Sequence, residues 1–415
     1  MFWKKRVYLD HASSTPVDPR VARAVLRAMA EFPGNPSAPH EEGRRASGAL
    51  FASRVSIARS LSIKPEELVF TSGGTEANNI AIRGLVEGLR TRGAAYAGLH
   101  IVSTAIEHSS VMKTLAALER EGVSVTYVGP GADGIVRAED VVRAIRPETA
   151  LVTLAHVNSE LGTVQPIAEI ATMIYHSARK RGASDAADVR DATSALSRFA
   201  PECRFPVIHA DAAQSPLYLD ASPHFLKADL VSYDAQKMRG PKGVGVLYRD
   251  FSVPLAPLYG GGTQERSLRP GTENVPAIVG AALAFTLAKE GRAARTAAVA
   301  AVRDFLVERI EAEIPAAKLI GHRTRRIANN AHFIIPGVSG DYLAVLMDKE
   351  GVAVTPRSAC VGSGEAFSHV VLAVTHDKDE AKETIRFSLG PETSRRDALR
   401  AVAALKKSIA VAVPR

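Results

Sequence analysis

The sequence predicts an α/β protein with a mostly parallel central sheet and a second, smaller α/β domain toward the C-terminus. Short, continuously apolar runs alternate with segments of helical spacing, as expected where helices cover both faces of a sheet. After Asn274 the composition changes to a long Ala-rich helical pattern followed by further short strands. The chain has 415 residues, more than one simple core needs, so two domains are the default expectation.

The first part of the chain supplies the strands of the central sheet and the helices between them. Asp18 is a side-chain cap for a helix over Val21–Met29. Further helical spacing begins at Thr75 and covers Val111–Leu118 and Ile167–Arg179. The expected strands are Glu67–Phe70, His100–Ser103, Val123–Val128, Ala150–His156, Val207–Ala210, Leu230–Ser232 and Val244–Tyr248.

The second part of the chain begins with a long helix. Pro276 suits a first helical turn, and the chain from Ala277 to about Glu313 is Ala-rich, free of Pro and helical in pattern. We expect one long helix there, joining the two domains. The elements expected after it are strands at Ala331–Ile335, Val352–Thr355 and Thr384–Leu389, and helices at Asp341–Asp348 and from Arg396.

Composition and charge exclude several classes of protein. Apolar residues make up 46% and charged residues 23%, which is an ordinary globular composition. No apolar run approaches the roughly 18–20 residues that span a bilayer, and no secretory signal is visible. The net charge of +8 suits nucleic acid binding or a soluble basic surface, and the lack of basic runs interleaved with aromatics favours the second.

The two cysteines, Cys203 and Cys360, exclude a disulfide-stapled scaffold and a Cys-rich zinc site. We therefore expect a reducing, cytoplasmic setting and no metal. Cys360 lies among small residues and glycines with Arg357 nearby, which favours a reactive thiolate over a buried structural cysteine. Cys203 lies in the Ala/Asp/Ser-rich segment Ala183–Phe205, which we expect to be a surface insertion, and no chemistry is expected from it.

A turn between a strand and a helix is a candidate phosphate site. The segment Phe70–Glu76 reads FTSGGTE, so two glycines turn the chain before a helix begins. Such a turn presents backbone N–H groups and the positive end of the helix dipole to an anion. An ordinary strand-to-helix turn explains the same residues equally well, and no Gly-Lys-Ser/Thr follows, which excludes the P-loop pattern.

An aspartate and a lysine end two further strands. Asp211 follows the apolar run from Val207, and Lys237 follows the run from Leu230. Ligands of open α/β sheets bind at the carboxyl ends of the strands. An amine there can form a Schiff base, and a buried carboxylate can hold a protonated pyridine nitrogen. Alone, a lysine at a strand end is more often a surface residue.

A series of stretches, spread over nearly the whole chain apart from the segment 183–205, matches one family. They read YLDHASSTPVDPRV, GNPSAPH, FTSGGTEANN, IEHSSV, HVNSELG, HADAAQS, QKMRGPKGVGVLY, GGGTQERSLRPGTEN, RSAC and IRFSLG. Through them the chain resembles cysteine desulfurases of the NifS/IscS kind, within the pyridoxal-phosphate (PLP) dependent class V aminotransferases. The resemblance implies fold type I, with a seven-stranded sheet in a large domain over 16–274. Residues 1–15 and 275–415 would then form the small domain that carries the catalytic cysteine loop.

The resemblance also implies a function. It is the removal of sulfur from L-cysteine, giving L-alanine and a persulfide on Cys360, by a homodimer that uses PLP. The sulfur would pass to an acceptor protein, such as an iron–sulfur scaffold or a tRNA-thiolation enzyme. A selenocysteine lyase or another enzyme of this scaffold stays open as an alternative, as does a non-catalytic dimeric binding or sulfur-relay protein.

The same resemblance implies roles for individual residues. Lys237 would bind PLP covalently, Asp211 would pair with its pyridine nitrogen, and His108 would stack on its ring and move protons. Further cofactor contacts would come from Gly74, Thr75, Ser159, Gln214, Gln236 and, toward the neighbouring subunit, Thr272. The substrate carboxylate would be bound by Asn35 and Arg386.

Two positions depart from the family pattern. Ser159 stands where the family usually has Asn. A hydroxyl is shorter than an amide, so we expect the hydrogen bond to the cofactor oxygen or substrate to be lost or bridged by water. Asp234-Ala235-Gln236 stands where the family usually has Ser-Gly-His, whose Ser and His contact the phosphate. A carboxylate would repel a phosphate. We therefore expect Asp234 to point away from it and to bond to backbone or to a cation.

Overall fold

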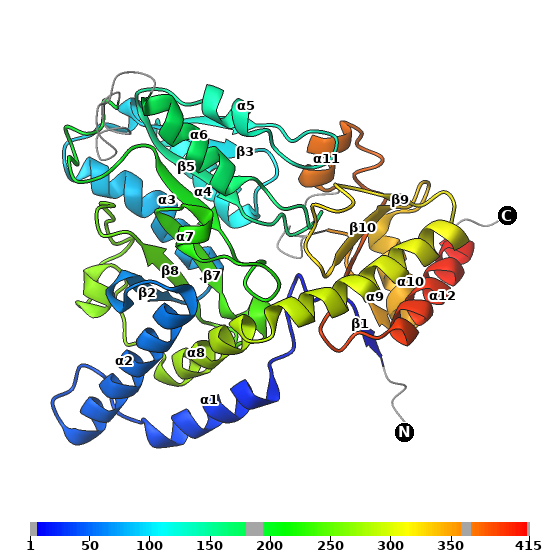
Figure 1. Cartoon of the computed structure of the whole chain (residues 1–415), viewed down its shortest axis with the longest axis horizontal. Helices are drawn as coiled ribbons and strands as arrows, with labels where there is room; N and C mark the ends of the chain where they lie inside the picture. Colours follow the sequence, from blue (N-terminus) through cyan, green and yellow to red (C-terminus); the bar gives the residue numbers. More distant parts are fainter. Residues whose placement is uncertain (1–5, 180–193, 358–366, 413–415) are drawn as a thin grey trace.

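The computed structural model describes residues 6–179, 194–357 and 367–412. A seven-stranded sheet with its helices occupies one side of the molecule, and a smaller three-stranded sheet with its own helices occupies the other (Figure 1). This arrangement confirms the expected α/β fold class. The domain limits expected from the sequence stay a prediction.

The large sheet is mostly parallel. Its strand order is β2-β8-β7-β6-β5-β3-β4, and the five strands β3 to β7 pair in parallel wherever they are neighbours. Only β8 breaks the pattern, since it runs antiparallel to both β7 and β2. The strands are β2 (Leu68–Thr71), β3 (His100–Thr104), β4 (Ser124–Val128), β5 (Thr149–Ala155), β6 (Val207–Asp211), β7 (Leu230–Asp234) and β8 (Gly245–Arg249).

Burial on both faces explains why these strands read as continuous apolar runs. Side chains of one strand alternate between the two faces, so Val102 and Val152 lie in one core cluster while Ile101 and Leu151 lie in another. Helices α3 (Gly74–Arg90) and α4 (Ser109–Arg120) cover the second face. The first face is covered by α5 (Ala138–Arg143), α6 (Ile167–Arg179), α7 (Pro223–Leu226) and α8 (Val275–Lys289).

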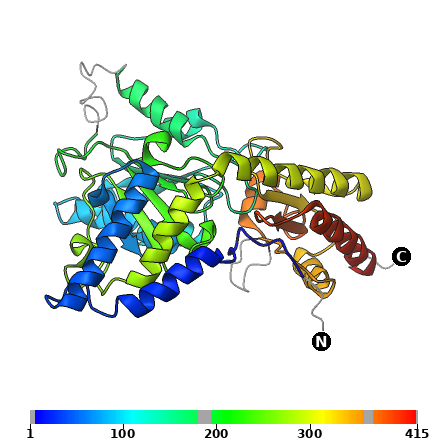
Figure 2. The same cartoon turned by 60° about the horizontal axis from the view of Figure 1, so that its bottom comes forward.

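The N-terminal helices extend the layer around α8. Helix α1 (Pro19–Glu31) begins at the expected cap, since Asp18 accepts a hydrogen bond from the Arg20 N–H at 2.9 Å. Helix α2 (Glu41–Leu61) follows it, and both pack against α8. Figure 2 shows this blue pair beside the yellow-green α8 on one face of the sheet.

The single long helix expected from Ala277 to Glu313 is wrong. Helix α8 ends at Lys289, and a separate helix, α9, covers Arg292–Glu313. Gly291 lies between them with φ 62°, a left-handed conformation that stops the helix and that glycine adopts without strain. No helix within the described residues is long and apolar enough to cross a membrane.

The smaller sheet is antiparallel, and its strand β10 contacts α9. Its order is β12-β10-β9. Helix α10 (Gly340–Lys349) packs against β12 and against α12 (Arg395–Ala412), and α12 packs against α9. The N-terminal strand β1 (Val7–Tyr8) pairs in parallel with β11 (Val352–Ala353), so the first residues of the chain join this smaller part. The remaining elements are β9 (Lys318–Leu319), β10 (Asn330–Ile334), β12 (Thr384–Ser388) and α11 (His369–Thr375).

The segment expected to be a surface insertion is partly a core segment. Residues 183–193 lie outside the described residues. Within 194–205, however, Leu196, Ala200, Cys203 and Phe205 are each no more than 1% exposed and belong to the same core cluster as α3 and α4. The expectation of a surface excursion is therefore wrong for these four residues, whose side chains belong to the core, while several of their neighbours within 194–205 are exposed.

Candidate active site

A cavity of about 260 Å³ lies where β6 and β7 end, next to the N-terminal segment that follows β1. This is the edge of an α/β sheet at which ligands are expected. Most of the residues that the sequence selects line this one cavity. They are Gly74, Thr75, His108, Ser159, Asp211, Gln214, Gln236, Lys237 and Arg386.

The lysine side chain is held against the N-terminal segment. Lys237 lies in a short 3₁₀ turn, Ala235–Met238, directly after β7. Its Nζ donates hydrogen bonds to the carbonyl oxygens of Ala12, at 2.7 Å, and Ser13, at 2.5 Å. Gln214 donates to the same Ala12 oxygen at 2.9 Å. The amine therefore lies at the cavity wall, where it can reach an electrophilic carbon of a ligand.

Asp211 presents a buried carboxylate at the end of β6. Its Oδ2 accepts a hydrogen bond from Asn78 Nδ2 at 2.8 Å, and its Oδ1 accepts one from the Ala213 N–H at 3.0 Å. Asn78 also donates to Ser110 at 2.9 Å, which fixes the amide between α3 and α4. A carboxylate held in this way can accept a hydrogen bond from a protonated ring nitrogen. Asn78 was not among the residues selected from the sequence. A polar Asn between the small apolar residues Ala77 and Ala81, all of them buried in the structure, is the signal that could have identified it.

The imidazole of His108 is fixed at the start of α4. Its Nδ1 accepts from the Ser110 N–H at 3.2 Å and lies 2.8 Å from Ser110 Oγ. The preceding residue, Glu107, is buried and accepts from Thr104 Oγ1 at 2.5 Å and from the Ala155 N–H at 2.8 Å. Burial raises the pKa of Glu107 to about 8. Glu107 thus ties the segment that carries His108 to β3 and β5, a role that the sequence did not reveal.

The start of α3 has features of an anion-binding site. Its N-cap is Gly73, which supplies no side chain to satisfy the first N–H groups of the helix. Gly245 of β8 packs directly against this turn, and a Cβ atom on it would lie 2.4 Å from the carbonyl carbon of Gly73. With the Thr75 hydroxyl also at the cavity, the turn has the donors that a phosphate group requires.

Asp234 lies against this turn. Its Oδ1 accepts from the Gln236 N–H at 3.2 Å, as an N-cap, and its Oδ2 accepts from Gln236 Nε2 at 3.0 Å. The expected bond to backbone is therefore confirmed. The expectation that Asp234 points away is wrong, because a Cβ atom on Gly74 would lie 3.5 Å from its Oδ2. Asp234 is the last residue of β7, and it lines the cavity.

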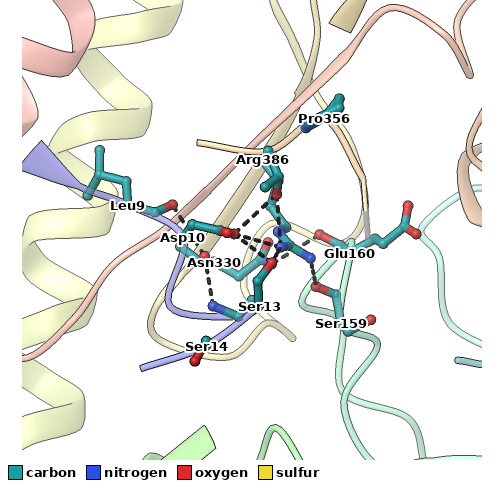
Figure 3. Close-up of polar contacts among 12 residues, drawn as sticks. Leu9, Asp10, Ser13, Ser14, Ser159, Glu160, Asn330, Pro356 and Arg386 are labelled. Carbon is teal, nitrogen blue, oxygen red and sulfur yellow. Dashed lines mark hydrogen bonds and ion pairs between the residues drawn. The ribbon is translucent and has the colours of Figure 1, made fainter. Parts of the chain in front are cut away.

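Arg386 of β12 enters the same cavity from the smaller sheet. The side chain is 1% exposed and pairs with Asp10 at 2.9 Å, and it donates to the backbone oxygen of Ser159 at 2.8 Å (Figure 3). Ser159 thus contacts Arg386 through its main chain. The cavity therefore holds a lysine amine, a carboxylate, an imidazole and a guanidinium together.

Three of the expected site residues are not brought to this cavity by the described chain. Asn35 is exposed between α1 and α2, where its Oδ1 accepts from the Ser37 N–H at 2.9 Å. Thr272 is exposed before α8, and neither residue lines the cavity. Cys360 lies outside the described residues. The roles of these three residues stay predictions.

Comparisons with known proteins agree on one family. A family model described as "Aminotransferase class-V" matches residues 7–198 and 190–400. The chain is 35% identical over 394 residues to the cysteine desulfurase IscS of Dictyoglomus turgidum, covering 95% of this chain and 92% of that protein.

Two solved structures are similar to this chain as well. A NifS-like protein superposes with a TM-score of 0.84 at 28% identity, covering 98% of this chain and all of that chain. A structure described as SspA in complex with cysteine superposes with a TM-score of 0.74 at 32% identity, covering 94% of this chain and all of that chain.

Proposed function

Because the chain belongs to the cysteine desulfurases of the aminotransferase class-V family, we propose that it removes sulfur from L-cysteine with PLP as cofactor. The products are L-alanine and a persulfide on Cys360. The observation that carries the proposal is the convergence of Lys237, Asp211 and the start of α3 on one cavity.

The residues of the cavity suit PLP in charge and in kind. The uncapped N–H groups of α3 and the Thr75 hydroxyl suit the phosphate. Asp211 suits the pyridine nitrogen, and Lys237 suits the aldehyde carbon. His108 and Gln214 line the same cavity and suit the ring and its phenolic oxygen. Bound PLP supplies an electron sink for the charge that develops at the substrate Cα.

Each remaining step belongs to a side chain of this protein. Arg386, with Asn35, binds the carboxylate of L-cysteine and so orients its Cα–H bond. Lys237 accepts the proton from Cα and returns it later in the reaction. His108 moves a proton to or from the substrate thiol.

Sulfur transfer is the step assigned to the cysteine that the family motif RSAC contains. The Cys360 thiolate attacks the substrate sulfur, and the bond between Cβ and sulfur breaks. The electron pair stays on the substrate, which takes up protons to become L-alanine, while the sulfur remains on Cys360. A sulfur-acceptor protein, such as an iron–sulfur scaffold or a tRNA-thiolation enzyme, then receives it.

A homodimer in the cytoplasm completes the proposal. Thr272 is exposed in this chain, which suits a contact with the cofactor phosphate of the partner subunit. Asn35 is exposed as well, between α1 and α2. The cysteine must start reduced to form a persulfide, which suits a reducing compartment.

A spectrum and an assay test the proposal. The purified protein should show the visible absorbance of bound PLP, and L-cysteine with a thiol reductant should give equal amounts of L-alanine and sulfide. The Lys237→Ala variant should lose the reaction. A wild-type protein that binds no PLP, or that binds it and releases no L-alanine from L-cysteine, would contradict the proposal.

A further inference from the structure

The side chain of Arg386 is held by a small polar network at one end of its guanidinium group. Its Nη2 lies 2.9 Å from Asp10 Oδ1 and 2.7 Å from Ser13 Oγ (Figure 3). It also lies 2.9 Å from Thr355 Oγ1. Nη2 carries two hydrogens, so three acceptors use it fully. Within the described residues, Nε of Arg386 is buried without a partner, so Nη1 and Nη2 make the side-chain contacts of the guanidinium.

Asp10 organises this network. Its Oδ1 accepts hydrogen bonds from Ser13 Oγ at 2.8 Å and from Thr355 Oγ1 at 3.2 Å, as well as from Arg386. A hydroxyl that donates to Asp10 turns its lone pairs toward other donors. The carboxylate therefore aims both hydroxyl oxygens at Arg386, and its loss would disturb all three contacts together.

The pairing also compensates a buried charge. Arg386 is 1% exposed, and the side chain of Asp10 is 15% exposed. A guanidinium held away from water is costly unless a carboxylate and hydrogen-bond acceptors surround it. The Asp10 carboxylate meets this need, so Arg386 can stay at the cavity before a substrate arrives.

Ser13 connects this network to the lysine. Its hydroxyl contacts Arg386, and its carbonyl oxygen accepts from Lys237 Nζ at 2.5 Å. The N–H groups of Ser13 and Ser14 in turn donate to the Asp10 carbonyl oxygen at 3.2 and 3.3 Å. One tight turn thus sets the position of Arg386 relative to Lys237.

We propose that Asp10 is a positioning residue, which holds Arg386 so that the carboxylate of an amino acid binds with its Cα beside Lys237. The proposal rests on the proposed function, in which Arg386 binds the substrate carboxylate. Asp10 acts through Arg386, because its side chain contacts Nη2 and the two hydroxyls and is not among the residues that line the cavity.

The Asp10→Asn variant tests this inference. It keeps the shape of the side chain and removes its charge. The dissociation constant for L-alanine, measured by calorimetry on the PLP-loaded protein, should rise at least tenfold, as expected when a charge-assisted network is lost. The KM for L-cysteine should rise by a similar factor, while the visible spectrum without amino acid stays unchanged. Ser13→Ala, which removes one hydroxyl of the network, should give a smaller loss.

The matched control is Asp348→Asn. Asp348 also pairs with an arginine, Arg6, near the start of the chain, but the pair is exposed and lies outside the cavity. This control should bind L-alanine as the wild type does. Unchanged or tighter binding in Asp10→Asn, or an equal loss in the control, would overturn the inference. A wild type that binds L-alanine but releases none from L-cysteine would contradict the proposed function alone.

Discussion

Replacing Asp234 by Asn should tighten the binding of PLP. Asp234 lies against the N-terminal turn of α3, and a Cβ atom on Gly74 would lie 3.5 Å from its Oδ2. Asn has nearly the same shape and keeps an oxygen that can accept from the Gln236 N–H. The substitution therefore removes a negative charge beside the proposed phosphate site and leaves the N-cap in place.

Coulomb's law gives the size of the effect. Two unit charges 4 to 8 Å apart repel by about 4 to 2 kcal/mol at an effective dielectric of 20. Water and salt in the cavity screen part of this repulsion. We expect a gain of about 1.4 to 2.8 kcal/mol, which tightens the dissociation constant about 10- to 100-fold.

Titration of the protein without cofactor measures the effect. PLP and pyridoxal, which lacks the phosphate, should be compared by visible absorbance for the wild type and for Asp234→Asn. Only PLP should bind more tightly to the variant. The control is Asp250→Asn. Because β8 runs antiparallel to β7, Asp250, which follows β8, lies near the start of β7, whereas Asp234 is at its end. Unchanged PLP affinity, or equal tightening for pyridoxal, would refute the reasoning.

Three further predictions concern the residues that support the cavity. Asn78→Ala removes a hydrogen bond to the Asp211 carboxylate, so PLP affinity in a titration should fall about tenfold or more. Gly245→Ala places a Cβ atom 2.4 Å from the carbonyl carbon of Gly73, so the melting temperature should fall. Gly48→Ala, at an exposed position of α2 with open space around it, should be neutral or stabilising by up to about 1 kcal/mol. Because burial raises the pKa of Glu107 to about 8 from 4.5, the folded protein keeps a proton that the unfolded chain releases. The free energy of unfolding should therefore fall as the pH rises from 4.5 to 8, and urea unfolding should show that Glu107→Gln removes this contribution.

Local patterns predicted the strands well because the sheet is buried on both faces. The expected run Val207–Ala210 became β6, one residue longer, and Asp211 stands at its end as expected. The same argument placed Lys237 after β7. In each case a continuous apolar run and one polar residue at its end carry the information within a few positions of the chain.

Long-range contacts explain what the sequence did not reveal. Asp10 lies 376 positions from Arg386, and Asn78 lies 133 positions from Asp211, so no local pattern links either pair. The break at Gly291 depends on one backbone conformation within a strongly helical pattern. The buried Cys203 shows that an Ala/Asp/Ser-rich segment can end in core residues.

The transfer of sulfur to Cys360 is the most direct test of the proposed function. The wild type should be incubated with L-cysteine without reductant, its thiols blocked, and its peptides mapped by mass spectrometry. The peptide that contains Cys360 should carry one additional sulfur atom, in step with the release of L-alanine, and Cys203→Ala should behave in the same way. An unmodified Cys360, or sustained L-alanine release by Cys360→Ala, would contradict it.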